Sequence, residues 1–242
     1  MLNSAVEIEQ TVTFNIDSHL KKRFPDLKVL TFQIDGVKVE KRDVELENFK
    51  EELTKQVRKQ YDLESLRNLS TFRAYRDFFW KVGIDPTKSR PAAEALIRRI
   101  LQGKTIPNIN TLVDAYNLAS IKTEIALAAF DANKLKDNLL MRFATEGEEF
   151  MGIGMEKPMR LEGREIVVSD GEKLIAVYPH RDADNTKITN KTVDVVMLVC
   201  GVPSIREETL QNAAQVATEY ITKFCGGKRI ARNKTFHALA SS

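Results

Sequence analysis

The sequence contains few of the residues on which thiol and metal chemistry depend. Its 242 residues include two cysteines and three histidines, and the cysteines, Cys200 and Cys225, form no CxxC pair. Because both cysteines lie among apolar residues, we expect buried thiols in a reducing compartment. The sequence therefore predicts neither a disulfide nor a metal site, and we expect no cofactor.

Long hydrophobic runs are also missing. No apolar run approaches the roughly 18 residues that a membrane-spanning helix needs. The N-terminal residues MLNSAVEIEQ are acidic, whereas a signal peptide begins with basic residues and a hydrophobic segment. We therefore expect a cytoplasmic protein with no membrane partner.

Familiar catalytic motifs are absent as well. The sequence has no P-loop, no HExxH and no GxSxG, each of which places chemistry at a defined spacing. Gly152-Ile153-Gly154 lacks the third glycine and the strand-to-helix setting of a dinucleotide-binding fold. We interpret it as a bend in a strand.

Positive charge is concentrated in two segments, although the net charge is only +3. Residues 71–105 hold eight basic side chains against three acidic ones, and residues 226–242 hold four basic side chains and no acidic one. Such segregation favours binding to a polyanion such as RNA, with an ordinary solvated surface as the alternative. The side chains expected to contact the polyanion are Arg90, Arg98, Arg99, Lys228 and Arg229.

The hydrophobic pattern predicts an α+β protein with a mainly antiparallel β body and helices packed against it. Short β-branched runs indicate strands over residues 6–14, 28–37, 138–144, 150–155, 165–169, 173–178 and 192–199. Apolar residues at helical spacing indicate helices over residues 45–61, 71–82, 91–103 and 204–226, with one more that begins at Asn108 or Asn110. We expect the helix at 45–61 to lie on the sheet.

The single tryptophan, Trp80, lies in the apolar helix at 71–82. An aromatic residue in such a helix favours a position in the core, and stacking on a nucleobase is the alternative.

Three polar residues stand out near the middle of the chain. Asn110, Asp114 and Asn117 are spaced at i, i+4 and i+7, which places them on one side of a helix. They can present two amides and a carboxylate to a single ligand. The alternative is that they cap and brace the neighbouring backbone.

A second polar group follows a predicted strand. His180 and Asp182 occur in Tyr178-Pro179-His180-Arg181-Asp182, with Thr186 a few residues further on. Because functional side chains are common in loops, this run is a candidate for a second wall of a pocket. The alternative is a surface turn held by a contact between the histidine and the aspartate.

The segment INTLVDAYNLASIKTEIALAAFDANKL, residues 109–135, resembles the signature of the editing domain (B3/4) in the β subunit of phenylalanyl-tRNA synthetase. That signature combines IN-x-x-VD-x-x-N-Y with a hydrophobic strand, AFD and KL. The matching residues are Ile109, Asn110, Val113, Asp114, Asn117, Ala129, Phe130, Asp131, Lys134 and Leu135, and Gly147-Glu148-Glu149-Phe150 resembles the family's GE-x-F step.

The resemblance implies a barrel-like β body and a free-standing copy of the domain. We expect one B3/4-like domain over residues 1–242. Its parts would be an N-terminal extension at 1–82, a recognised core at 83–200, a C-terminal helix at 201–225 and a basic tail at 226–242.

The resemblance further implies that the partner is tRNA and that the activity is hydrolysis of a wrongly charged aminoacyl-tRNA ester. An ester carries an adequate leaving group, so oriented water can suffice without a nucleophilic triad. The chain has Ala128 where the family commonly has a histidine, and Val199 where a glutamate would precede the cysteine. The alternative function is a non-catalytic module that binds tRNA or a small amino-acid-like ligand.

With those two polar groups missing, the chemistry must come from other residues. The predicted catalytic residues are His180, Asp182 and Asp114, and the predicted substrate-binding residues are Asn110, Asn117, Phe130, Asp131 and Thr186.

Overall fold

The computed structural model describes residues 12–136, 138–230 and 234–237. The helices are α1 (Ser18–Arg23), α2 (Val44–Gln60), α3 (Ser70–Lys81), α4 (Ala92–Leu101), α5 (Thr111–Thr123) and α6 (Glu207–Cys225), with short 3-10 helices η1 (Leu66–Asn68), η2 (Ala132–Lys134) and η3 (Asp184–Thr186). The strands are β1 (Phe14–Ile16), β2 (Lys28–Val37), β3 (Ala126–Asp131), β4 (Leu139–Phe143), β5 (Glu149–Phe150), β6 (Met159–Arg160), β7 (Ile166–Ser169), β8 (Leu174–Tyr178), β9 (Arg181–Asp182), β10 (Val195–Cys200), β11 (Gly226–Arg229) and β12 (Lys234–His237).

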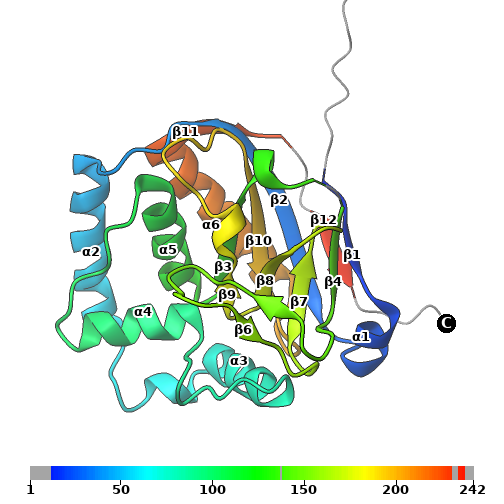
Figure 1. Cartoon of the computed structure of the whole chain (residues 1–242). Helices are drawn as coiled ribbons and strands as arrows, with labels where there is room; N and C mark the ends of the chain where they lie inside the picture. Colours follow the sequence, from blue (N-terminus) through cyan, green and yellow to red (C-terminus); the bar gives the residue numbers. More distant parts are fainter. Residues whose placement is uncertain (1–11, 137, 231–233, 238–242) are drawn as a thin grey trace, which may run out of the picture.

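Two open sheets form the body of the protein (Figure 1). Sheet A has the order β1-β4-β7-β8-β9 and is antiparallel except for the parallel pair β1 and β4. Sheet B has the order β11-β2-β10-β3, with β12 also paired to β2, and is antiparallel throughout. The α+β class with mainly antiparallel strands is thus confirmed. The described strands form no closed barrel, because each sheet ends in edge strands that do not pair with the other sheet.

Sheet B lies between sheet A and two helices. Figure 1 shows α5 and α6 on one side of sheet B and sheet A on the other, and α6 contacts both β2 and β10. All residues of β3 and β10 are buried. Coverage on both faces explains why β10 has the continuous apolar sequence VVMLVC and no alternation.

A second apolar cluster joins the helices to one another. Leu53 and Val57 of α2 pack in one cluster with Ile97 and Ile100 of α4 and Leu118 of α5. The expectation that this helix lies on the sheet is therefore wrong. Its apolar stripe meets the apolar stripes of α4 and α5, and Figure 1 shows α5 between α2 and sheet B.

The two ends of the chain differ from expectation in different ways. The predicted strand at 28–37 is β2, with the same bounds, whereas the predicted strand at 6–14 lies almost wholly outside the described residues. The predicted basic tail at 226–242 contains β11 and β12, and both pair with β2. The segment that contains β11 and β12 is mainly polar, and it joins sheet B by backbone pairing with β2.

Trp80 is on the surface and not in the core. Its side chain is 58% exposed, whereas Phe72, Tyr75, Phe78 and Phe79 of the same helix are at most 1% exposed. These four aromatic side chains fill the buried face of α3. Trp80 falls outside that face because successive residues of a helix are about 100° apart.

Candidate functional site

A small cavity opens where strand ends of both sheets meet α5 and the start of α4. Its volume is about 160 Å³. The lining residues are Ala92 of α4, Tyr116 and Asn117 of α5, Ala126, Leu127 and Ala128 of β3, Ala176 to Asp182 of the β8–β9 segment, and Leu198 and Cys200 of β10. Segments that are far apart in the sequence therefore contribute to one site.

The turn between β8 and β9 positions His180 and Asp182. A cis peptide bond joins Tyr178 to Pro179, and the backbone N–H of His180 donates to the carbonyl of Val177 at 2.8 Å. The strand β9 then returns along β8, with Asp182 opposite Ala176. Both predicted residues consequently line the cavity, while their catalytic roles stay predictions.

Two tyrosine hydroxyl groups hold the strand ends in place. The hydroxyl of Tyr75 donates to the carbonyl of Cys200 at 2.5 Å and accepts from the backbone N–H of Ala126 at 3.1 Å. The hydroxyl of Tyr178 donates to the carbonyl of Gly201. These bonds connect β3, β8 and β10, so the cavity walls are fixed without a ligand.

Four polar side chains converge on the cavity without partners. Tyr116, Asn117, His180 and Asp182 line it, and within the described residues none of these side chains has a hydrogen-bond or ion-pair partner. Polar groups in a concave, partly dry site lose free energy unless water or a ligand bonds to them. An apolar pocket with a few convergent polar groups is the usual form of a small-molecule site.

Burial sets the protonation of these groups. It raises the pKa of Asp182 to about 7, and it raises the pKa values of Tyr116 and of the Cys200 thiol above their ordinary values. The pKa of His180 is lowered, first by burial and then by the positive charge of Arg181. At neutral pH the imidazole, the phenol and the thiol are therefore uncharged, and Asp182 is close to its midpoint.

The structure does not pair His180 with Asp182. In the described part of the chain no hydrogen bond joins the two side chains, and the neighbour of the imidazole is the ring of Phe79, with centroids 6.2 Å apart. The alternative interpretation of a turn held by a His-Asp contact is therefore wrong. Each side chain is instead available to a ligand in its own right.

Asn110 and Asp114 lie away from the cavity. Asn110 is the N-cap of α5, where its side-chain oxygen accepts from the backbone N–H of Val113 at 2.9 Å. The carboxylate of Asp114 accepts from Lys50 Nζ at 2.7 Å and from the backbone N–H of Ile109 at 3.0 Å. This is the capping and bracing arrangement that the alternative interpretation describes, and only Asn117 of the three reaches the cavity.

The other predicted substrate-binding residues, Phe130, Asp131 and Thr186, do not line the cavity. Phe130 is fully buried in the core. Asp131 accepts from the hydroxyl of Thr192 at 2.8 Å and caps η2 through the backbone N–H of Asn133. The hydroxyl of Thr186 is buried and is the one side-chain oxygen or nitrogen in the described residues found fully buried without a hydrogen-bond partner.

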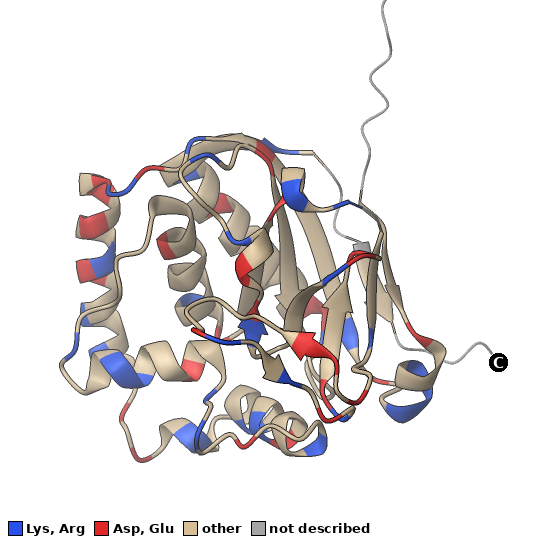
Figure 2. Ribbon diagram, in the orientation of Figure 1, with Lys and Arg blue, Asp and Glu red and all other residues tan. Residues whose placement is uncertain are grey.

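The predicted basic contacts separate into two regions. Arg90, Arg98 and Arg99 lie in or next to α4, and β11 carries Lys228 and Arg229. Figure 2 shows these two regions at opposite ends of the molecule, so they do not form one continuous basic surface.

Several of these basic groups have internal partners. Arg98 and Arg99 donate to the carbonyls of Leu63 and Thr105, at 3.5 Å and 2.5 Å. The guanidinium of Arg229 lies 4.6 Å from the ring centroid of Phe32, and burial lowers its pKa. Arg90 and Lys228 are exposed and are therefore the better candidates for contact with a polyanion.

Sequence reasoning missed Tyr116 and Cys200 as cavity residues. Apolar spacing places Tyr116 on the hydrophobic face of the predicted helix, and its position beside Asn117 is the signal that it reaches the cavity. Of the two departures from the family pattern, Ala128 lines the cavity and Val199 does not. Alternation along β10 directs Leu198 and Cys200 into the cavity and Val199 to the opposite face.

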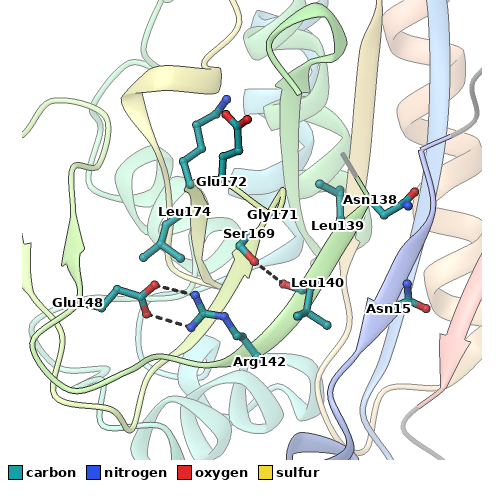
Figure 3. Close-up of a pocket in the computed structure, with 11 residues that line it drawn as sticks. Asn15, Asn138, Leu139, Leu140, Arg142, Glu148, Ser169, Gly171, Glu172 and Leu174 are labelled. Atoms are coloured by element: carbon teal, nitrogen blue, oxygen red, sulfur yellow. Dashed lines mark hydrogen bonds and ion pairs between the residues drawn. The ribbon is translucent and has the colours of Figure 1, made fainter. Parts of the chain in front are cut away.

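A larger, more open hollow of about 530 Å³ lies on sheet A (Figure 3). Arg142 and Glu148 form a bidentate ion pair there, with N–O distances of 2.6 and 2.9 Å. The other two charged lining residues, Glu172 and Lys173, are paired with Lys136 and Asp170. Because every charged residue of this hollow is already paired, it offers a charged ligand less than the small cavity offers.

Among the described residues no group of three or more His, Cys, Asp or Glu side chains is placed to hold a metal ion. No helix in that part of the chain is long and apolar enough to cross a membrane.

The part of the chain that lines the cavity matches a known domain family. The B3/4 domain family model matches residues 74–226, which include all of the cavity lining. The phenylalanine–tRNA ligase beta subunit of Thermotoga maritima is 26% identical over 119 residues, or 49% of this chain and 15% of the relative. That of Lactobacillus acidophilus is 31% identical over 111 residues, or 46% of this chain and 14% of the relative. This chain thus spans about a seventh of the length of these relatives.

A solved structure also resembles the chain. It is an N-terminal fragment of the phenylalanyl-tRNA synthetase beta-subunit from Pyrococcus horikoshii, with a TM-score of 0.49 and 15% sequence identity over 90% of this chain and 50% of that chain.

Proposed function

The chain belongs to the B3/4 domain family, and from this premise we propose that it binds tRNA and hydrolyses the ester of a wrongly charged aminoacyl-tRNA. The observation that carries the proposal is the set of four unpartnered polar side chains in one small cavity, Tyr116, Asn117, His180 and Asp182. The named relatives are phenylalanine–tRNA ligase beta subunits, which supports an aminoacyl-tRNA as the substrate class.

The size of the cavity fits the aminoacyl part of such a substrate. Its volume of about 160 Å³ is close to the ~150 Å³ that admits a benzene molecule and below the ~300–1,000 Å³ of pockets for drug-sized ligands. An amino-acid side chain of moderate size fits, and the terminal nucleotide stays outside. The walls of Ala126, Ala128, Ala176 and Leu198 favour an apolar side chain.

The polar groups can divide the work of hydrolysis. Water adds to the ester carbonyl carbon and loses its proton to the neutral imidazole of His180, which returns a proton to the departing ribose oxygen. Asn117 and Tyr116 can hydrogen-bond the carbonyl and the water. A carboxylate at Asp182 can pair with the α-ammonium of the aminoacyl group, since it has no internal partner.

The alternative is a module that binds the aminoacyl end without cutting the ester. The apolar pair Ala128 and Leu198, which are opposite each other on β3 and β10, favours this alternative because it provides no proton acceptor on that wall of the cavity.

A panel of mischarged tRNAs separates the two functions. We expect purified protein to release one amino acid or a small class of them faster than the uncatalysed reaction, with the tRNA recovered intact. If tRNAs bind but no ester is cleaved faster than in buffer, the protein is the binding module. If no tRNA binds at low salt, the proposal fails.

Replacing His180 with alanine should slow deacylation about 100-fold or more, the usual effect of losing a general base. Because the pKa of His180 is lowered from 6.5, the imidazole is neutral at pH 7, and its contribution should disappear only as the pH falls below about 6.5. Rates between pH 5 and 8 test this. The control is His19→Ala, an exposed histidine in α1. An unchanged rate and pH profile in His180→Ala would assign the proton transfer elsewhere.

Charge variants should change the salt dependence of tRNA binding. Deleting the tail would remove β11 and β12 from sheet B, so point substitutions are the cleaner test. If Arg90 contacts a phosphate, Arg90→Gln should reduce the slope of log affinity against log salt by about 0.7 to 0.9. Lys228→Gln, at the opposite end of the molecule, tests whether the second basic region also takes part. An affinity independent of salt in the wild-type protein would rule out electrostatic binding of tRNA.

A further inference from the structure

We propose that Trp80 is a platform on which a base of the single-stranded 3′ end of the tRNA stacks while the aminoacyl group occupies the cavity. The inference rests on the proposed function and extends it to the part of the substrate that the cavity is too small to hold. It assigns a role to the one tryptophan of the sequence.

The exposure of Trp80 is the first observation. It is 58% exposed, in a helix whose other large aromatic residues are buried. A large apolar ring left in water gains stability when it is covered. Among aromatic side chains, indole offers a large flat face for a nucleobase.

The position of Trp80 is the second observation. The preceding residue, Phe79, lies against His180, with ring centroids 6.2 Å apart. Arg76, four residues before Trp80 and so on the same face of α3, is bonded to Glu94 in the first turn of α4 at 3.0 and 3.2 Å.

Those two contacts place the part of α3 that carries Trp80 next to two segments that line the cavity. His180 and Ala92, the first residue of α4, both line it. Trp80 therefore stands on the part of α3 that lies between the β8–β9 turn and the start of α4.

The charge around Trp80 is the third observation. Lys81 follows it on α3, and the exposed side chains of Lys88 and Arg90 lie in the connector that leads to Ala92. Asp77 is the one acidic residue of α3. Figure 2 shows this end of the molecule marked by several basic residues. The combination of an exposed ring and basic side chains is the usual surface for single-stranded nucleic acid.

The size of the cavity determines what must lie on this surface. The ester joins the aminoacyl group directly to the last ribose. With a volume of about 160 Å³ the cavity holds no nucleotide in addition. The last nucleotides must then lie outside the cavity, and in this proposal one of their bases stacks on Trp80. Stacking accepts any base, so the platform does not restrict the tRNA sequence.

Intrinsic fluorescence tests the proposal directly, because Trp80 is the only tryptophan. We expect a short single-stranded oligoribonucleotide with a free 3′ end to quench the emission, and a duplex of the same length with no single-stranded end to quench it much less. With labelled RNA, Trp80→Ala should bind about 5- to 150-fold more weakly, the effect of losing one stacked base. Trp80→Phe keeps an aromatic ring, so its affinity for the RNA should lie between those of the wild type and Trp80→Ala.

The matched control is Val44→Ala, an exposed apolar residue, 77% accessible, at the start of α2. No quenching, or equal quenching by single strand and duplex, would overturn the proposal, as would an unchanged affinity in Trp80→Ala. If the wild type cleaves an ester while Trp80→Ala keeps its KM, stacking is wrong and the proposed function stands. If the wild type cleaves none, the hydrolytic function is wrong, and the quenching experiment still decides on stacking.

Discussion

Replacing Asp114 with alanine should lower the free energy of unfolding by about 3–5 kcal/mol, the usual cost of removing one partner of a buried ion pair. Asp114 and Lys50 are 2% and 5% exposed, and Lys50 Nζ lies 2.7 Å from the carboxylate. Burial raises the pKa of Asp114 even though Lys50 donates to it. Removing the carboxylate leaves the ammonium in the interior with Glu47 and Asn108 as its remaining acceptors.

Urea denaturation of three variants measures the effect. Asp114→Asn keeps the shape and should cost less, about 1.5–3 kcal/mol for the loss of a charge-assisted bond. The matched control is Lys55→Ala. This substitution breaks the ion pair between Lys55 and Glu52 of α2, and both of those side chains are 63% exposed. That pair should contribute less than about 1 kcal/mol.

Activity then distinguishes structure from catalysis at Asp114. Because its side chain does not line the cavity, deacylation per folded molecule should be unchanged in Asp114→Asn. A stable Asp114→Asn protein with a greatly reduced rate would return this residue to the catalytic site.

Much of the fold follows from local patterns in the sequence. The β-branched run at 28–37 and the helical spacing at 91–103 depend on neighbours in the chain, and both gave elements at the expected places. The docking of α2, the exposure of Trp80 and the strands within 226–242 depend on distant partners. A stripe of apolar residues predicts that one face of a helix is buried, but it does not predict whether a sheet or other helices bury that face.

The candidate site shows the same limit. Asp114 and Asn117 lie within α5, whereas Asn110 precedes it as the N-cap with extended backbone, and seven residues extend about 10 Å along a helix. The first turn therefore faces Lys50 of α2 and the second reaches the cavity. His180 and Asp182 were found because a strand end with polar residues is a local signal. Tyr116 and Cys200 were missed because lining a cavity is a property of the assembled strands.

Replacing Asp182 with asparagine should raise the free energy of unfolding at alkaline pH, whereas replacing Asp114 lowers it. The same substitution should weaken binding of the aminoacyl-tRNA substrate. Burial raises the pKa of Asp182 to about 7, whereas the unfolded chain ionises near 3.9. Between about pH 4 and pH 7 the folded state therefore holds a proton that the unfolded state has lost. Stability consequently falls as the pH rises through this window.

At pH 8 the buried, charged carboxylate of Asp182 lowers the free energy of unfolding, and Asp182→Asn removes this charge. A pKa difference of one unit corresponds to 1.36 kcal/mol, so about 4 kcal/mol is the upper bound, and partial exposure of Asp182 reduces the expected gain to about 2 kcal/mol. The other cavity groups do not titrate between pH 7 and 8, since the pKa values of Tyr116 and Cys200 are raised and that of His180 is lowered. At pH 4 the variant and the wild type should be equally stable.

The same substitution should weaken the substrate complex, because an amide cannot pair with the α-ammonium. We expect the KM for aminoacyl-tRNA to rise at pH 8 and to approach the wild-type value below pH 6, where Asp182 is itself uncharged. The matched control is Asp184→Asn, two residues away, whose half-exposed carboxylate pairs with Lys187. The free energy of unfolding at pH 4 and pH 8 tests the predicted change in stability. The KM for aminoacyl-tRNA over the same pH range tests the predicted role in substrate binding. A variant that is less stable at pH 8 would mean that Asp182 has a stabilising partner in the folded protein, and a KM that does not change would remove it from the substrate site.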